Sequence, residues 1–458
     1  MPTNSMHRAK ATVASLIACC GLAACSSSGG GGMAQPGDVS GRYVLTISDA
    51  DMTAPAVVTN QLGERDLNVS DTMTIVQLPI TEPQTPYAQV PVSNSVLGPP
   101  QQVAVTPDGR LAFVVESRGP APSGATTIDD LPPGQRLTMI DLTSLAAPIV
   151  VDEMDLNDTP GSVAVHPDGT LVALTTSTPG HQIVILPIEE TGEGGRRLGS
   201  PMAWEVMGLD SSEALASTIN FSPSGNIVAI TLPERDEVMF YEFTRAAQLE
   251  GGATGFGLAP IGEPVHVGKF PYSGQFTPDG RYFITTDLQW GENVEDYLVG
   301  APEGTLTVVR VPTVQSSDGE AAFSGGEVVS RLPVGISPEG LAISRDGKYV
   351  VTANLRRSFL PEEDPRLTRG GSVSLLSLSN SGELSPAGEY ELDGMPEGVC
   401  FDAADRFVVV TQFRSFDPRA VDGELAFLEL DKGSNPTLKM TDFRLGVGKG
   451  PHGVLIVR

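Results

Sequence analysis

The chain has 458 residues, with 51 Gly, 37 Pro, a hydrophobic fraction of 40% and an aromatic fraction of 6%. This apolar content excludes a wholly disordered chain, and the lack of long apolar runs beyond the N-terminus excludes an integral membrane protein. Because 56 acidic residues face 29 lysines and arginines, the net charge is −27. Such a surface repels phosphate backbones and argues against nucleic-acid binding. The simplest interpretation of the negative charge is that it keeps the protein soluble.

The N-terminus has the pattern of an export signal. Arg8 and Lys10 precede the apolar run ATVASLIACCGLAA, which is too short for a stable membrane span. The run ends in Leu-Ala-Ala-Cys at Cys25, and a flexible Ser/Gly stretch follows. Leu-Ala-Ala-Cys resembles the bacterial lipobox, which implies cleavage before Cys25 and acylation of this cysteine. We predict a signal peptide over 1–24, a tether over 25–40 and a membrane anchor.

Three cysteine-related observations refine this prediction. Ser26, rather than Asp, follows Cys25, which in lipoprotein sorting indicates the outer membrane, here facing the periplasm. Cys19 ends a shorter competing lipobox, and an ordinary secretory signal is a further alternative. Processing at Cys25 leaves Cys400 as the one other cysteine, so no internal disulfide forms. The apolar context of Cys400 predicts a buried side chain, with a reactive thiol as the alternative.

The rest of the chain repeats one pattern, in which a leading residue, usually Pro, comes before a strand and a Pro-Asp-Gly-like turn. Six segments show the pattern with its turn: Pro100–Gly109, Pro160–Gly169, Ala216–Gly225, Pro271–Gly280, Pro338–Gly347 and Pro396–Asp405. A seventh, Pro451–Arg458, ends the chain. The turn glycines are spaced by 60, 56, 55 and 67 residues, which indicates propeller blades or solenoid units.

Each unit contains four predicted strands. After Gly109, the segments LAFVVE, LTMIDL and PIVVDEM have the period of two and the β-branched residues of strands. The seventh unit has one strand, while RYVLTIS, TMTIVQL and AQVPVS remain unassigned near the N-terminus. We predict that these three strands complete the last blade beside 451–458. The expected fold over 41–458 is therefore all-β: a seven-bladed β-propeller of four-stranded antiparallel blades, without an open sheet edge.

The segment Pro338–Leu376 resembles the YVTN repeat, with Val351-Thr352-Ala353-Asn354 nearest to its signature. The resemblance implies that the chain belongs to the superfamily of lactonase-like seven-bladed propellers. It predicts the fold and does not predict a reaction. Phosphogluconolactonase-like members carry a histidine two residues after the leading proline. In this sequence that position holds Gln102, Ser162, Thr218, Ser273, Gly340, Gly398 and Gly453.

The residues that directly follow the leading positions are expected to ring one mouth of the central channel, the usual ligand face of propellers. They are Gln101, Gly161, Ser217, Tyr272, Glu339, Glu397 and His452. Glu339, Glu397 and His452 lie on neighbouring blades and are candidate catalytic groups, because paired carboxylates raise one another's pKa and a histidine can share a proton. Gln101 and Tyr272 are candidate ligand contacts. Alternatively, the ring solvates the mouth or holds water or a cation.

Loops on the same face concentrate the basic residues. The tripeptide Arg-Ser-Phe occurs at 357–359 and at 414–416. Arg356, Arg357 and Arg414 are candidate ligand-binding residues, because a guanidinium can clamp a carboxylate or phosphate with two hydrogen bonds. The alternative is that these arginines pair with acidic residues of the same loops and hold the loops rigid.

These observations favour a monomeric, lipid-anchored envelope protein that binds a small carboxylate ligand or an envelope protein partner. The alternative is a lactonase or cycloisomerase-type enzyme acting on a small organic acid, in which His452 or Glu397 moves the proton while Arg357 and Arg414 hold the carboxylate. A structural scaffold is the third interpretation. The sequence has no zinc-protease, haem-attachment or nucleotide-binding motif, so we predict no metal and no cofactor.

Overall fold

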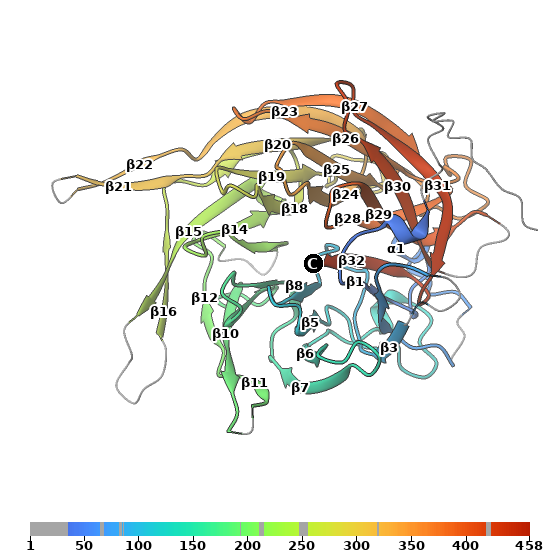
Figure 1. The fold of residues 1–458 in the computed structure, drawn as a ribbon, viewed down its shortest axis with the longest axis horizontal. Helices are drawn as coiled ribbons and strands as arrows, with labels where there is room; N and C mark the ends of the chain where they lie inside the picture. The colour runs from blue at the N-terminus through green and yellow to red at the C-terminus, as the bar shows by residue number, and fades with distance from the viewer. Residues whose placement is uncertain are drawn as a thin grey trace, which may run out of the picture. The chain divides into compact units, whose positions relative to one another are not determined.

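The computed structural model describes residues 35–64, 68–81, 85, 87–192, 194–209, 215–246, 255–317, 320–417 and 423–458. Their strands form seven blades arranged in a ring (Figure 1), which confirms the predicted all-β propeller. The predicted signal peptide 1–24 and Cys25 lie outside the described residues. In the part of the chain that is described, no helix has the length and apolar character needed to cross a membrane.

Blades 1 to 4 follow the chain order, each beginning with its innermost strand. Blade 1 consists of β4 (Val103–Val105), β5 (Leu111–Val115), β6 (Arg136–Asp141) and β7 (Ile149–Asp155). Blade 2 consists of β8 (Pro160–Val165), β9 (Leu171–Thr176), β10 (Ile183–Glu190), β11 (Arg196–Leu198) and β12 (Met202–Trp204). Blade 3 consists of β13 (Ile219–Phe221), β14 (Ile227–Leu232), β15 (Glu237–Ala246), β16 (Gly255–Pro260) and β17 (Val265–His266). Blade 4 consists of β18 (Pro271–Phe276), β19 (Tyr282–Asp287), β20 (Glu303–Arg310) and β23 (Glu327–Ile336), with the added hairpin β21 (Thr313–Ser317) and β22 (Glu320–Ser324).

Blades 5 to 7 complete the ring. Blade 5 consists of β24 (Pro338–Ile343), β25 (Tyr349–Asn354), β26 (Ser372–Leu378) and β27 (Leu384–Glu391). Blade 6 consists of β28 (Gly394–Phe401), β29 (Phe407–Ser415), β30 (Glu424–Asp431) and β31 (Thr437–Gly446). Blade 7 consists of β32 (Pro451–Val457), β1 (Tyr43–Ser48), β2 (Thr72–Gln77) and β3 (Tyr87–Pro91). The described helical segments are short: η1 (Pro36–Asp38), α1 (Ala56–Thr59), η2 (Ile128–Asp130) and η3 (Pro233–Arg235).

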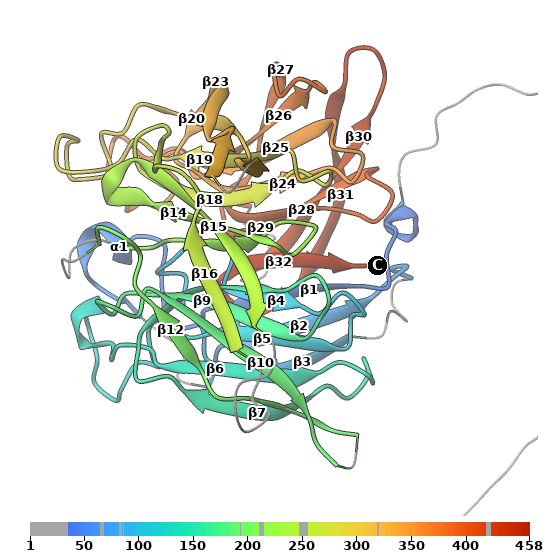
Figure 2. The same cartoon turned by 90° about the vertical axis from the view of Figure 1, so that its left-hand side faces the viewer.

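Blade 7 joins the two ends of the propeller. The innermost strand, β32, pairs antiparallel with β1, in register from Tyr43 opposite Val457 to Ile47 opposite Gly453. This is the predicted closure of the ring, and Figure 2 shows β32 in the middle of the molecule with β28 on one side and β1 on the other. The closure covers both edges of an otherwise open arrangement, because each terminal blade gains a packed neighbour.

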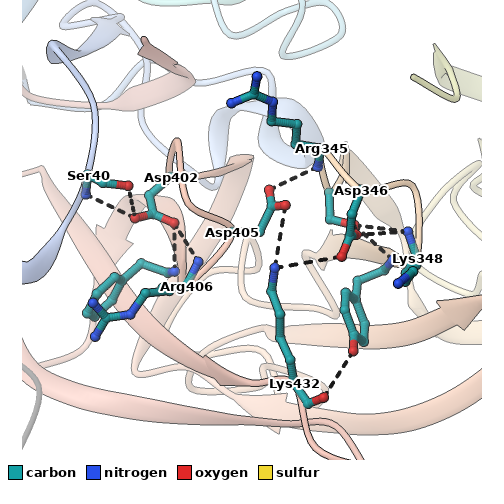
Figure 3. Close-up of polar contacts among 11 residues, drawn as sticks. Ser40, Arg345, Asp346, Lys348, Asp402, Asp405, Arg406 and Lys432 are labelled. Atoms are coloured by element: carbon teal, nitrogen blue, oxygen red, sulfur yellow. Dashed lines mark hydrogen bonds and ion pairs between the residues drawn. The ribbon is translucent and has the colours of Figure 1, made fainter. Parts of the chain in front are cut away.

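A buried carboxylate adds a second connection between the two ends of the ring. Asp402 stands at the turn position where blades 1, 3, 4 and 5 carry a hydroxyl residue, and one of its oxygens accepts hydrogen bonds from the backbone of Arg406 and Phe407. Its other oxygen accepts bonds from the backbone nitrogen and hydroxyl of Ser40, at 2.9 and 2.6 Å (Figure 3). The segment before β1 is thereby attached to blade 6.

The same turn lacks the glycine found in the other blades. Asp405 takes its place with a φ of 51°, in the left-handed region. The Asp405 carboxylate accepts a hydrogen bond of 2.9 Å from the backbone of Arg345 in the turn of blade 5 and faces the ammonium of Lys432 at 3.5 Å (Figure 3). The bond from Arg345 connects two blades, and together these contacts offset the conformational cost of a non-glycine residue at this turn.

Glycines behind the leading residues allow the innermost strands to approach closely. A Cβ atom at Gly340 would lie 2.2 Å from the carbonyl oxygen of Glu397, and one at Gly398 would lie 2.5 Å from that of His452. Such distances are too short for any side chain, so β24, β28 and β32 touch through their backbones. This approach brings Glu339 and Glu397, each directly before its glycine, to the same small region of the channel.

The contacts of Asp402 predict a measurable contribution to ring closure. In the Asp402→Ser variant, a hydroxyl remains at the turn, as at Ser344, but the oxygen that binds Ser40 is lost. We expect the free energy of unfolding to fall by about 1–3 kcal/mol, because a buried bond to a charged acceptor is removed. Urea unfolding of the variant measures this change. The Thr277→Ser variant is the control for the turn itself, and equal stability of both variants would contradict the assigned role.

Candidate functional site

A cavity of about 390 Å³ lies at the channel mouth on the face that bears the leading residues. Tyr272, Glu339 and Glu397 from the inner strands line it, together with side chains from loops of several blades. The predicted ring thus exists in part, since three of its seven members share this cavity.

The walls of the cavity are apolar and come from segments far apart in the sequence. Met52 and Ala54 from the segment between β1 and β2 pack in one cluster with Trp290, Phe359 and other buried residues of blades 1, 4, 5 and 6. Exposed apolar loops of this size would be costly in water, so their packing over the channel is favourable. The result is a cap that shields the inner carboxyl groups from solvent.

Glu339 and Glu397 form the polar floor of the cavity. They are only 5% and 3% exposed, and their carboxyl groups lie close enough for each to shift the pKa of the other. Burial raises the pKa of Glu339 to about 7, and burial together with the charge of Glu339 raises the pKa of Glu397 well above its ordinary value. The pair therefore holds a shared proton near neutral pH, with one carboxylate and one carboxylic acid side by side.

Tyr272 stands beside this pair. Burial and the negative charges of Glu339 and Glu397 raise the pKa of its phenol well above the ordinary value, so the hydroxyl keeps its proton. The ring stacks on Phe270 at a centroid distance of 6.2 Å and contacts Trp290 at 6.0 Å. Tyr272 is therefore a fixed hydrogen-bond donor next to an acid–base pair.

His452 lies apart from the carboxyl pair. It is fully buried, and its Nε2 lies 2.7 Å from Oδ1 of Asn94. The amide nitrogen of Asn94 donates to the carbonyl oxygens of Ser48 and Val92, so its oxygen faces the ring and Nε2 carries the hydrogen. Burial lowers the pKa of His452 to about 3, and the ring is neutral. His452 does not line the cavity, and its proton-transfer role stays a prediction.

Gln101 also points elsewhere. Its amide nitrogen donates a 2.8 Å hydrogen bond to the carbonyl oxygen of Gly274, so the side chain extends from blade 1 to blade 4. Gln101 lines the deeper channel compartment rather than the cavity with the carboxyl pair. A ligand contact by Gln101 therefore stays a prediction.

The comparisons with known proteins concern the fold. No family model and no curated protein sequence matches the chain. Among solved structures, the periplasmic gluconolactonase of Pseudomonas aeruginosa has a TM-score of 0.54 at 17% identity, covering 91% of this chain and 99% of that one. A protein of Bacteroides uniformis assigned as a 6-phosphogluconolactonase has a TM-score of 0.55 at 13% identity, covering 91% and 100%.

The chain has the fold of the lactonase-like seven-bladed propellers. This confirms, for the fold, the resemblance first seen in the YVTN-like repeat. At these identities the likeness does not extend to a reaction, so the chemistry of this propeller is argued from its own residues.

The repeated Arg-Ser-Phe tripeptides make the same contact in successive blades. Arg357 of blade 5 donates from Nε to the carbonyl oxygen of Val299 at 2.8 Å and from Nη2 to that of Ala301 at 3.4 Å, both in the loop of blade 4. Arg414 of blade 6 donates to the carbonyl oxygens of Ser358 and Leu360 in the loop of blade 5. Each arginine thus fixes the cavity wall contributed by the preceding blade.

Two arginines of this region form ion pairs with glutamates. Arg356 forms ion pairs with Glu389 and Glu391 at 3.0 and 3.1 Å, and Arg414 also pairs with Glu362 at 2.6 Å. These contacts correspond to the alternative in which arginines hold the loops rigid. Binding of a ligand by Arg356, Arg357 or Arg414 stays a prediction.

Sequence reasoning missed the wall that comes from the segment after β1. Asp49 holds this wall by accepting bonds from the backbone of Met52 and Val96, and Asp71 accepts from Ala50. Burial raises the pKa of Asp49 to about 6 and that of Asp71 to about 8. The segment joins the second and third strands of its blade. This position in the topology was the signal in the sequence that could have placed the segment on the face of the cavity.

Two further predictions concern single groups. Cys400 is buried and free, as expected of a small apolar side chain, and burial raises the pKa of its thiol. Within the described residues, no three or more His, Cys, Asp and Glu side chains are grouped so that they could hold a metal ion.

The arginine contacts predict a selective loosening of the cavity wall. In the Arg357→Ala variant, the loop carbonyls of blade 4 lose their donor, so we expect faster amide hydrogen exchange in residues 288–302. The matched control is Arg356→Ala, which removes the same charge but only surface ion pairs worth up to about 1 kcal/mol. Mass spectrometry of exchange measures both. Equal exchange of this loop in the two variants would contradict the assigned contact.

Proposed function

We propose that this propeller is an enzyme of the lactonase type, which hydrolyses a small cyclic ester in the cavity at the channel mouth. The observation that carries the proposal is the buried Glu339–Glu397 pair on the floor of an apolar cavity. Buried acid pairs with raised pKa values are typical of sites that transfer protons at neutral pH. The fold shared with a gluconolactonase supports this class of reaction by analogy.

The pair supplies both proton transfers of an ester hydrolysis. The carboxylate takes a proton from water while the water oxygen attacks the ester carbonyl carbon, and the Tyr272 hydroxyl stabilises the oxyanion that forms. The neutral carboxylic acid gives its proton to the ring oxygen as the carbon–oxygen bond breaks. One proton enters the pair and one leaves it, so the pair regains its single proton while the lactone opens to a hydroxy acid.

The charge of the site restricts the substrate. The ionised half of the Glu339–Glu397 pair repels anions, and no lysine or arginine is among the described residues that line the cavity. A substrate without negative charge therefore suits this cavity better than a small carboxylate. The hydroxy acid ionises after its release from the ester and is then repelled, which favours product release.

Location in the envelope is part of the proposal. The lipobox-like sequence ending at Cys25 supports a lipid anchor in the outer membrane, with the propeller in the periplasm. One of the structurally similar proteins is described as periplasmic. A monomer that turns over a small molecule needs no protein partner at this location.

The first prediction of the proposal concerns turnover. Glu397→Gln and Glu339→Gln each remove an oxygen that carries or accepts the shared proton, so we expect kcat for uncharged lactones to fall by about 10²–10⁴-fold. The control is Glu383→Gln, since Glu383 is exposed and far along blade 5. A titrimetric assay of acid release measures turnover. Unchanged kcat in both pair variants, where the wild type hydrolyses a lactone, would overturn the mechanism.

The second prediction concerns stability and pH. The folded state raises the pKa of Glu339 from 4.5 to about 7, so it binds protons more tightly than the unfolded chain. The stability contributed by this protonation is complete at low pH and is lost between about pH 4.5 and 7. In the Glu339→Gln, Glu397→Gln double variant neither residue can ionise, so this part of the stability is not lost as the pH rises. We expect its melting temperature to fall less than that of the wild type between about pH 5 and pH 8.

Differential scanning calorimetry at the two pH values tests this expectation. Asp49 and Asp71 remain in both proteins and contribute equally, so the difference between the two isolates the glutamate pair. An identical decrease in the two proteins would show that the pair ionises in the folded state as it does in the unfolded chain.

A further inference from the structure

The carboxyl pair on the cavity floor has no counter-ion. Glu339 and Glu397 are each other's charged neighbours, and among the described side chains neither of them takes part in an ion pair with a lysine, arginine or histidine. The guanidinium of Arg357, in the loop after β25, donates to backbone carbonyls. A charge that is more than nine-tenths buried is costly unless an opposite charge lies near it. The cavity therefore lacks the cation that such a pair normally has.

The walls next to the pair are aromatic. Phe270 contacts Trp290 and Tyr297 at centroid distances of 5.7 and 6.0 Å, and Tyr272 completes a group of four rings that line the cavity. The Trp290 indole is held in place by a 2.9 Å hydrogen bond to Ser337. Aromatic faces attract cations, and a tryptophan does so most strongly.

The rim of the cavity is apolar as well. Val57, Leu215 and Tyr297 are lining residues that remain 41%, 39% and 39% exposed, which is unusual for large hydrophobic side chains on a very acidic protein. Such a rim suits a ligand that carries carbon groups around its charge. A bare metal ion would gain nothing from these walls.

We propose that the cavity binds an organic cation, namely a substituted ammonium group, whose positive charge faces the Glu339–Glu397 pair and whose carbon substituents contact the aromatic walls. The inference rests on the proposed function insofar as it names the substrate class: the ester hydrolysed at this site carries an ammonium group. The binding itself does not depend on turnover, because the missing counter-ion and the aromatic lining are properties of the cavity alone.

A pair of probes with the same shape tests the charge preference directly. Choline and 3,3-dimethylbutan-1-ol differ in one atom, since a neutral carbon replaces the charged nitrogen. Isothermal titration calorimetry of the full protein at about pH 8, where the Glu339 carboxyl group is mostly ionised, measures both. We expect choline to bind about ten-fold or more tightly than the alcohol. This comparison uses the wild-type protein and does not depend on the folding of any variant.

Variants then assign the preference to its residues. The Glu339→Gln, Glu397→Gln double variant removes the negative charge and keeps the aromatic walls, so the preference for choline over the alcohol should fall several-fold without disappearing. The Trp290→Leu variant should weaken choline more than the alcohol. The Glu383→Gln variant is the control and should behave as the wild type.

Equal affinity for the two probes, tighter binding of the alcohol, or no binding of choline at millimolar concentration would each overturn the inference. An undiminished preference in the double variant would overturn it as well. These outcomes are separate from the turnover test. A protein that hydrolyses neutral lactones through Glu397 but binds both probes equally keeps the proposed function and loses only the cationic substrate class.

Discussion

The antiparallel pairing of β32 with β1 is the constraint on which the remaining structure depends. It joins the two ends of the chain in one blade, and the ring it closes forces seven inner strands toward a common axis. Inner strands this close leave no space for a side chain at Gly340 and Gly398, and the glutamates before these glycines meet as a consequence. The candidate site thus follows from closure and from the repeated order of leading residue and glycine.

The glutamate pair is tolerated because the rest of the cavity is built around it. Two buried carboxyl groups without a cation reduce stability at neutral pH, and sharing a proton lowers this cost. The apolar cap keeps water away, while Arg357 and Arg414 hold the cap loops from one blade to the next. The pair thus reduces stability within an otherwise well-packed propeller. Residues that do so are expected to be kept for a function rather than for the structure.

The fold and part of the site could be predicted from the sequence, because their signals are local. Period-two strands and Pro-Asp-Gly turns repeat, and a fixed offset in each repeat placed Tyr272, Glu339 and Glu397 on one ring. The separate position of His452 depends on its bond to Asn94, a residue before blade 1 whose partner no pattern reveals. The arginine contacts go to backbone carbonyls about one blade upstream, and a carbonyl group has no sequence signature.

The central claim is that Glu339 and Glu397 share a proton near neutral pH. Carbon-13 NMR of protein labelled at the glutamate carboxyl carbons measures it, with the Glu339→Gln, Glu397→Gln double variant identifying the two signals. The account predicts that the signals of this pair titrate near pH 7 and above, while those of exposed glutamates titrate near their ordinary pKa of about 4.3. Titration of the pair together with the exposed glutamates would contradict the account.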